Sequence, residues 1–293
     1  MTTIGPQELT LSAADGYQLA ASHFPGRGEQ FIVLAGATAV ARRYYQRFAS
    51  YAAGQGVDVL TVDYRGIGGS RHGRMRDLDT DLSHWCTLDL GAAVSWAAER
   101  GPTYLVGHSL GGHAIGRLPD PGLLQAAYTC GTGAAWTGWM PRREAVRVRL
   151  MWDVVAPLST AMMGYLPMHA FGMGEDIPRR AYQQWRQWGR LPRYFFDDPD
   201  ATAITAPFAE VRLPIAAMVV TDDLWAPPRS RDAFFSGYSS AQVDRIDLEP
   251  AELGVPRVGH MGYFHSDVGR VLWPQILTWL TVHGLRTVGS RSN

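Results

Sequence analysis

The stretch that decides the fold reads Leu105-Val106-Gly107-His108-Ser109-Leu110-Gly111-Gly112. An apolar run at 103–106 leads into it and small residues at 112–118 follow, which predicts a strand, a sharp turn and a helix. Gly107 and Gly111 flank Ser109 at the spacing of a nucleophile elbow, where strand and helix pass so closely that a Cβ atom would collide. We expect the Ser109 hydroxyl and the Leu110 N–H to point into the same space at a helix N-terminus, which favours a developing negative charge.

The composition is that of one globular domain. The chain has 293 residues, a formal net charge of zero and 46% hydrophobic residues. A neutral balance gives no reason to expect a nucleic acid or an anionic membrane as a partner. The sequence contains no lysine, which excludes Schiff-base chemistry, a pyridoxal phosphate lysine and a P-loop lysine. No cofactor is expected.

Cysteine usage and hydropathy bear on the compartment. Two cysteines, Cys86 and Cys130, do not make a disulfide scaffold. The first eleven residues are polar and show no signal-peptide pattern. No stretch reaches the ~20 apolar residues that a membrane helix needs. We therefore expect a cytoplasmic protein without a membrane span.

Strands and helices alternate before the elbow. The expected elements are a β-hairpin at 8–24, buried strands at 31–35 and 57–62, and helices at 42–53 and 82–100. This order predicts an α/β fold with a doubly wound, mostly parallel sheet. Ligands of such sheets bind beyond the carboxyl ends of the strands. The segments 35–37 and 63–66 should therefore meet Ser109 at one edge.

The alternation stops after a strand at 126–130. The next seventy residues, 131–200, are rich in Trp and Met and too long for a simple connection. We expect them to form an inserted, mainly helical lid or cap, with the core at 1–130 and 201–293. Helices are expected in the cap at 142–155 and 178–188. Most of its aromatic residues should form the cap's own small core, while a minority line a pocket for an apolar acyl substrate.

Two partners for the serine follow in the chain. A serine hydroxyl needs a base to remove its proton, and a third group must orient that base. Asp222 and Asp223 follow an apolar strand at 213–220, and His260 lies in a loop after the final strand. A serine, an acid and a histidine in this order, each at a strand end, are typical of a serine hydrolase on a doubly wound sheet.

The sequence resembles an α/β-hydrolase from about Glu8 to the last helix. The motifs that carry the resemblance are Gly107-His108-Ser109-Leu110-Gly111-Gly112, Asp63-Tyr64-Arg65-Gly66-Ile67-Gly68-Gly69-Ser70 and Gly259-His260-Met261-Gly262. The chain is most similar to bacterial predicted hydrolases that carry Ala35-Gly36-Ala37-Thr38 where many relatives have His-Gly, and an Asp-Asp-x-x-Ala-Pro loop at 222–227.

The resemblance implies a role for each matching residue. Ser109 is the nucleophile, His260 the base and Asp223 the acid, while the backbone N–H groups of Leu110 and Ala37 form the oxyanion hole. The family places the acid four residues before a proline, which favours Asp223 over Asp222.

Other polar residues near the motifs receive lesser roles. Asp222 stays the alternative acid and otherwise makes a turn contact. His108 is interpreted as a packing or hydrogen-bonding residue, and His265 as a weaker base candidate outside the Gly-His-x-Gly context. No metal-ligand spacing is evident among the nine histidines.

These motifs predict hydrolysis of an ester or related acyl bond through an acyl-enzyme. Two alternatives stay open: an acyltransferase that uses the same triad with an acceptor other than water, and a binding protein that keeps the fold without turnover. The serine at the elbow disfavours the aspartate nucleophile of dehalogenases and epoxide hydrolases.

Overall fold

The structure, a computed structural model, describes residues 5–26 and 28–287. The strands of its main sheet are β1 (Gln7–Ser12), β2 (Gln18–Phe24), β3 (Phe31–Ala35), β4 (Asp58–Val62), β5 (Thr103–His108), β6 (Leu124–Cys130), β9 (Ile215–Val220) and β10 (Val243–Leu248). They lie in the order β1-β2-β4-β3-β5-β6-β9-β10. β2 is antiparallel to β1 and to β4, and the remaining pairs are parallel. The predicted doubly wound, mostly parallel sheet is confirmed.

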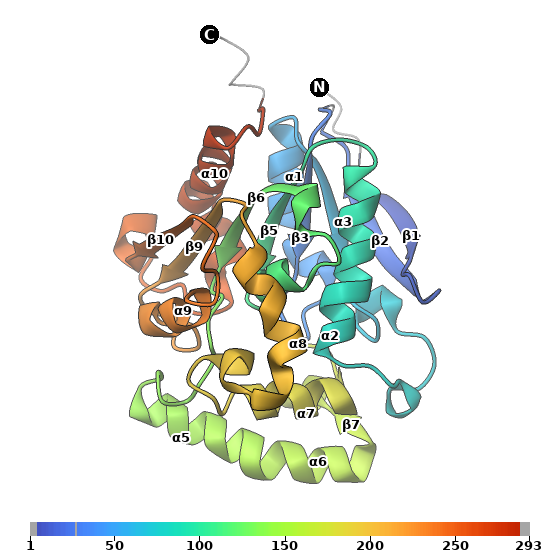
Figure 1. The fold of residues 1–293 in the computed structure, drawn as a ribbon, viewed down its shortest axis with the longest axis vertical. Helices are drawn as coiled ribbons and strands as arrows, with labels where there is room; N and C mark the ends of the chain where they lie inside the picture. The colour runs from blue at the N-terminus through green and yellow to red at the C-terminus, as the bar shows by residue number, and fades with distance from the viewer. Residues whose placement is uncertain (1–4, 27, 288–293) are drawn as a thin grey trace.

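Helices cover both faces of the sheet (Figure 1). On one face, α1 (Gln46–Gly54) and α10 (Ser266–Val282) share an apolar layer with the strands. On the other, α3 (Leu90–Ala98) and α9 (Pro228–Phe235) do the same. The strands β3, β4, β5 and β9 are buried along their whole length, as the continuous apolar runs predict. The two apolar layers therefore hold the strands, and with them the loops at their carboxyl ends, in place from both faces.

Two of the predicted helices are interrupted. The helix expected at 42–53 begins with a 3-10 turn, η1 (Arg42–Tyr45), before α1. The helix expected at 82–100 consists of α2 (Leu82–His84), a π-helical turn η4 (Trp85–Asp89) and α3. The elbow helix α4 (Leu110–His113) begins directly after Ser109, two residues earlier than expected, and continues as η5 (Ile115–Arg117).

The segment between β6 and β9 lies across the lower end of the molecule in Figure 1. Its longest element is a continuous helix made of α5 (Arg142–Leu150), the π-helical turn η7 (Met151–Val155) and α6 (Ala156–Met163). This helix is longer than the expected 142–155. Pro157 has no N–H for a backbone bond, and the π turn directly before α6 accommodates it.

The remaining elements are short. They are β7 (Tyr165–Leu166) and β8 (Ile177–Pro178), which pair with each other, α7 (Arg179–Trp188), α8 (Thr202–Thr205), and the 3-10 turns η2 (Gly68–Ser70), η3 (Met75–Asp77), η6 (Pro121–Leu123), η8 (Met168–Phe171), η9 (Tyr194–Asp197), η10 (Pro199–Ala201), η11 (Ala206–Glu210), η12 (Pro250–Leu253) and η13 (Gly262–Phe264). Within residues 5–26 and 28–287, every helix is too short or too polar to cross a lipid bilayer.

Candidate active site

The elbow between β5 and α4 holds Ser109 in a strained conformation. Its φ is 51°, in the left-handed region that residues other than glycine rarely adopt. A Cβ on Gly107 would lie 2.8 Å from the Gly111 carbonyl carbon, and a Cβ on Gly111 would collide with the Ala35 backbone. Both positions therefore require glycine. The Leu110 N–H opens α4 next to Ser109 and donates to no backbone group within the described ranges.

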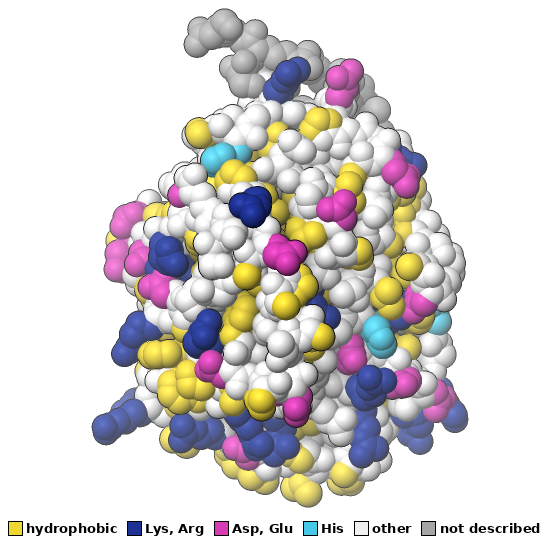
Figure 2. Space-filling model, in the orientation of Figure 1, with side chains coloured by type: hydrophobic (Ala, Val, Ile, Leu, Met, Phe, Trp, Pro, Cys, Tyr) yellow, Lys and Arg dark blue, Asp and Glu magenta, His cyan; other side chains and the backbone are white. Residues whose placement is uncertain are grey.

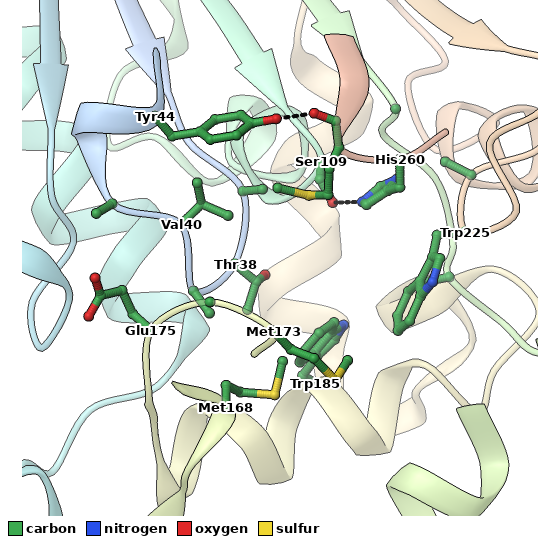
Figure 3. Close-up of a pocket in the computed structure, with 18 of the residues that line it drawn as sticks. Thr38, Val40, Tyr44, Ser109, Met168, Met173, Glu175, Trp185, Trp225 and His260 are labelled. Carbon is green, nitrogen blue, oxygen red and sulfur yellow. Dashed lines mark hydrogen bonds between the residues drawn. The ribbon is translucent and has the colours of Figure 1, made fainter. Parts of the chain in front are cut away.

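Ser109, His260 and Asp223 meet at this edge of the sheet. The His260 Nε2 atom lies 3.0 Å from Ser109 Oγ, and Figure 3 shows the two side chains pointing toward one another. The Nδ1 atom lies 2.9 and 3.1 Å from the two carboxylate oxygens of Asp223. A carboxylate only accepts, so the neutral ring carries its proton on Nδ1 and leaves Nε2 free to accept the Ser109 proton.

Asp223 is fully buried and keeps its charge through hydrogen bonds. Its Oδ1 accepts from the Trp225 N–H at 2.9 Å and the Ala226 N–H at 3.0 Å, and its Oδ2 accepts from the Tyr263 hydroxyl at 2.7 Å. Burial raises the pKa of this carboxyl, but the His260 ring and the hydrogen bonds outweigh burial and hold the pKa below its ordinary value. The carboxylate is therefore ionised beside the imidazole at neutral pH.

Asp222 binds the backbone of the histidine loop. Its carboxylate accepts the N–H of Val258 at 2.9 Å and the N–H of Gly259 at 3.0 Å. It makes no hydrogen bond to the His260 ring among the contacts of the described chain, in contrast to Asp223. The contacts of Asp222 thus hold the loop, and those of Asp223 orient the ring.

A buried chain of hydrogen bonds connects three loops around the elbow. The His108 Nε2 lies 2.8 Å from the His260 carbonyl oxygen, which only accepts, so Nε2 donates. Burial lowers the pKa of His108 to about 3, so the ring is neutral and its Nδ1 accepts from the Tyr45 hydroxyl at 2.9 Å. The Tyr45 oxygen in turn accepts the Ala37 N–H at 2.7 Å.

One bond of this chain involves the Ala37 N–H, the second donor predicted for the oxyanion hole. The Ala37 N–H was expected to face the oxyanion, but it donates to the Tyr45 phenol. The physical reason is that Tyr45, from the 3-10 turn η1, is fully buried against the end of β3 and needs a donor for its oxygen. Of the two N–H groups predicted to form the oxyanion hole, that of Leu110 is the one without a backbone acceptor within the described ranges.

A cavity of about 590 Å³ opens above Ser109 and His260. One wall follows β3 and includes Thr38, Val40 and Tyr44, which Figure 3 draws to the left of Ser109. The opposite wall comes from the inserted segment and from the β9 loop, and includes Met168, Met173, Trp185 and Trp225. Most lining side chains are apolar, and Arg43, Arg147 and Glu175 are the charged ones. The volume and the mainly apolar walls suit a small, largely apolar ligand.

Trp225 connects the catalytic edge to the inserted segment. Its ring stacks on the His260 ring at 6.2 Å between centroids, and its Nε1 donates to Glu144 of α5 at 3.1 Å. The rings of Trp152 and Trp185 lie 6.2 and 6.0 Å from it. Two tryptophans of the segment are therefore connected to His260 through Trp225.

Two other predicted positions lie outside the cavity. The loop 63–66, expected at the same edge, braces the end of β3, because the Tyr64 hydroxyl donates to the Gly36 carbonyl at 3.2 Å. His265 is exposed and packs beside the Tyr44 ring at 5.9 Å. Among the described residues, no three His, Cys, Asp or Glu side chains are arranged to hold a metal ion.

Sequence reasoning missed three residues of the site. Tyr263 donates to Asp223, Tyr45 binds both Ala37 and His108, and Trp225 packs on His260. Tyr263 and Trp225 lie within three residues of His260 and Asp223 in the sequence, and that proximity was the available signal. No local pattern marks Tyr45.

Solved structures of similar fold include esterases and a lipase. A soluble variant of monoglyceride lipase from Saccharomyces cerevisiae superposes with a TM-score of 0.67 at 15% identity, over 98% of this chain and 97% of that one. An esterase from Pyrococcus furiosus gives a TM-score of 0.61 at 12% identity, over 95% and 91% of the two chains. A thermophilic esterase from Thermogutta terrifontis gives 0.56 at 17% identity, over 96% and 100%.

The sequence itself was compared with curated proteins and with protein families. No curated protein matches the chain. The family described as the Alpha/beta hydrolase family matches residues 31–271, which span the sheet from β3 to the first part of α10 and include Ser109, Asp223 and His260. The chain therefore belongs to the alpha/beta hydrolase family.

Proposed function

We propose that the chain is a serine hydrolase that cleaves an ester, or a related acyl bond, of a small apolar substrate. The observation that carries the proposal is the double contact of one imidazole, 3.0 Å from Nε2 to Ser109 Oγ and 2.9 Å from Nδ1 to Asp223 Oδ2. A hydroxyl becomes an effective nucleophile when a base accepts its proton and a third group orients that base. The esterases and the lipase of similar fold support a hydrolase.

The reaction proceeds through an acyl-enzyme. His260 Nε2 takes the Ser109 proton as Oγ attacks the substrate carbonyl carbon, and Asp223 stabilises the resulting imidazolium. The Leu110 N–H donates to the oxyanion of the tetrahedral intermediate, and one such donor contributes ~3 kcal/mol. The imidazolium then gives its proton to the leaving alcohol. Water, activated by His260, attacks the acyl group and releases the acid and free Ser109.

The Ala37 N–H can donate to the oxyanion only after its hydrogen bond to Tyr45 breaks. It donates to Tyr45 at 2.7 Å, so it reaches an oxyanion only if that bond opens. A negatively charged oxygen is a stronger acceptor than a phenol, which favours the exchange when the intermediate forms. The resting enzyme thus presents one donor and keeps the other paired.

The walls of the cavity support an apolar acyl group. Val40, Met168 and Met173 contribute aliphatic or thioether side chains, and Trp185 and Trp225 contribute aromatic faces. We propose that residues 131–200 act as the cap that supplies several of these groups and excludes water from the bound ester. The cavity of about 590 Å³ limits the substrate to a small molecule.

Hydrolysis of a p-nitrophenyl short-chain ester by the purified protein tests the proposal. Ser109→Ala should abolish turnover, and a fluorophosphonate probe should label the wild-type chain but not this variant. Ser95→Ala, at an exposed position of α3, is the matched control and should keep both properties. Turnover retained by Ser109→Ala would remove this serine from the mechanism.

Product analysis in the presence of an added alcohol separates hydrolysis from acyl transfer. The proposal expects free acid as the main product. A new ester of the added alcohol as the main product would instead assign the chain as an acyltransferase.

A further inference from the structure

The long helix 142–163 carries an exposed row of apolar side chains on its outer face. Its members, here called the apolar stripe, are Val146, Leu150, Val154, Leu158 and Met162, which are 67, 57, 46, 61 and 84% exposed. With Met163, this one helix holds six of the eleven large hydrophobic side chains that are strongly exposed in the described chain. Single exposed apolar residues are ordinary, but a contiguous row of this length marks an interaction surface.

The π-helical turn keeps the stripe on one face. Its members recur every four residues, and four residues of an α-helix advance by about 40° more than a full turn. Over four such steps the row would drift by about 160° around an uninterrupted α-helix. The turn η7 takes up an extra residue between Leu150 and Leu158, which removes about 100° of that drift. The stripe therefore drifts by only about 60° along α5 and α6 and stays on one side of the helix.

The inner face of the same helix is already occupied. Ala145, Val148, Trp152 and Ala156 are buried, and the first three form a cluster with Met140. Trp152 contacts Trp225, whose ring stacks on the catalytic histidine. The stripe is thus the unpartnered side of a helix whose opposite side packs toward the active site.

Arginines without an acidic partner among the described residues flank the stripe in α5, and one of them, Arg149, donates to the Thr137 hydroxyl at 3.1 Å. Arg142, Arg143 and Arg149 are exposed and have no acidic partner among the described residues, whereas Arg147 pairs with Glu144 at 2.6 Å. Helical geometry places the first three within about 60° of Val146, on both sides of the stripe. Figure 2 shows hydrophobic side chains along the lower edge of the molecule below a band of arginines, where Figure 1 places α5 and α6.

The carboxylates of this helix do not offset those charges. Glu144 is engaged by Arg147, and Asp153 is engaged by Arg186 and Arg190. The second half of the helix, α6, contains no charged residue. The face therefore combines an uncharged apolar end with a cationic end, although the whole chain has a net charge of zero.

We propose that this face docks on an anionic phospholipid surface. The apolar stripe lies among the acyl chains at the interface, and the arginines, with long apolar stems, reach the phosphate groups. A second copy of the chain fits the face less well, because both carboxylates of the helix are already paired and leave no acidic partner for its arginines. The net charge of the whole chain is zero and by itself predicts no anionic membrane as a partner. The docking therefore depends on the local positive charge of α5.

Flotation with lipid vesicles tests the docking independently of catalysis. Ser109→Ala protein should float with phosphatidylglycerol vesicles at low salt and should bind phosphatidylcholine vesicles on the order of 100-fold more weakly, since each arginine at an anionic surface contributes about a fivefold gain. Added salt should weaken the binding to phosphatidylglycerol. Failure to float with phosphatidylglycerol vesicles would overturn the proposal, whatever the outcome for ester hydrolysis.

Substitutions at exposed positions of the helix separate the apolar contribution to vesicle binding from the electrostatic one. Leu150→Gln with Leu158→Gln and Met162→Gln should lower affinity for phosphatidylglycerol vesicles at least tenfold. Val282→Gln, at a 77% exposed site in α10, is the control and should bind as before. Because all these side chains are exposed, thermal melting should be unchanged, which shows that the variants fold.

Charge removal should change lipid preference. Arg142→Gln with Arg143→Gln and Arg149→Gln should abolish the preference for phosphatidylglycerol, while Arg74→Gln, an exposed arginine paired with Asp77, should not.

Light scattering tests whether the same face instead binds a second copy of the chain. The wild type could instead form a dimer that the Leu150→Gln, Leu158→Gln and Met162→Gln substitutions dissociate. That result, together with no vesicle binding, would assign the face to self-association and overturn the proposal.

Discussion

Asp222 and Asp223 are adjacent in the chain and hold the histidine loop in two different ways. Asp222 accepts the backbone N–H groups of Val258 and Gly259, and Asp223 accepts from the His260 ring. One carboxylate therefore positions the peptide and the other positions the imidazole. The two neighbouring acids therefore make separate contacts with the loop.

Substitution at the two positions should have unequal effects. Asp223→Asn removes the charge that stabilises the imidazolium and should lower kcat for a p-nitrophenyl ester by about 10⁴-fold. Asp222→Asn keeps one acceptor oxygen for the loop and should lower kcat far less. Equal losses in the two variants, measured on proteins with the same melting behaviour, would show that the ring does not depend on Asp223 in particular.

Trp225 should affect binding more than chemistry. Replacement by Ala removes an aromatic wall of the cavity and the ring that stacks on His260, so KM for an apolar ester should rise about tenfold while kcat changes less. Trp225→Phe keeps a ring and should recover most of the affinity. Trp96→Ala, on α3 outside the cavity, is the control for loss of a tryptophan. A loss confined to kcat would contradict this assignment.

Stability should fall in mild acid because two histidines are buried in neutral form. Burial lowers the pKa of His108 to about 3 and that of His113 to about 4. The unfolded chain takes up protons near pH 6.5 that the folded chain does not, so the unfolding free energy decreases as the pH falls from about 6.5 toward 4. Each ring contributes about 1.4 kcal/mol per pH unit.

Urea unfolding at pH 7, 6 and 5 measures this slope. His113→Gln keeps a donor for the Gly133 carbonyl, which His113 Nε2 contacts at 2.8 Å, and removes the titration. Its pH slope should be shallower than that of the wild type by about 1.4 kcal/mol per pH unit. An unchanged slope would show that His113 is protonated in the folded chain.

Gly111 should be irreplaceable at the elbow. Its Cβ would collide with the Ala35 backbone, so Gly111→Ala should destabilise the fold by about 3 kcal/mol or more or prevent folding. Gly54, in the last turn of α1, has no atom within 4 Å of the corresponding Cβ position. Gly54→Ala should therefore be neutral or stabilise by up to about 1 kcal/mol. Thermal melting of the two variants gives the comparison.

Local spacing was enough to predict the sheet and the meeting of the distant site residues. The continuous apolar runs at β3, β4 and β9 predict strands buried on both faces, and glycines around Ser109 predict the elbow. Once the strands are parallel, their carboxyl ends share one edge, so the positions of Asp223 and His260 follow from the order of the elements.

The contacts that local spacing does not encode were missed. The Ala37 N–H is captured by Tyr45 because a buried phenol needs a partner, and only the packing of η1 against β3 shows that the two are close. The helix 142–163 continues past its predicted end because Pro157 falls where a π turn already omits an α-helical bond. The first case depends on tertiary packing, and the second on a local departure from α-helical geometry.

The bond from the His108 ring to the His260 carbonyl has a mechanical consequence. His108 immediately precedes Ser109 at the end of β5, and its Nε2 lies 2.8 Å from the carbonyl oxygen of His260. Ser109 and His260 are thereby both connected to the last residue of β5, a central strand of the sheet. A displacement of the main chain at His260 would therefore pull on the residue next to Ser109, so this bond resists a change in the distance between the two side chains.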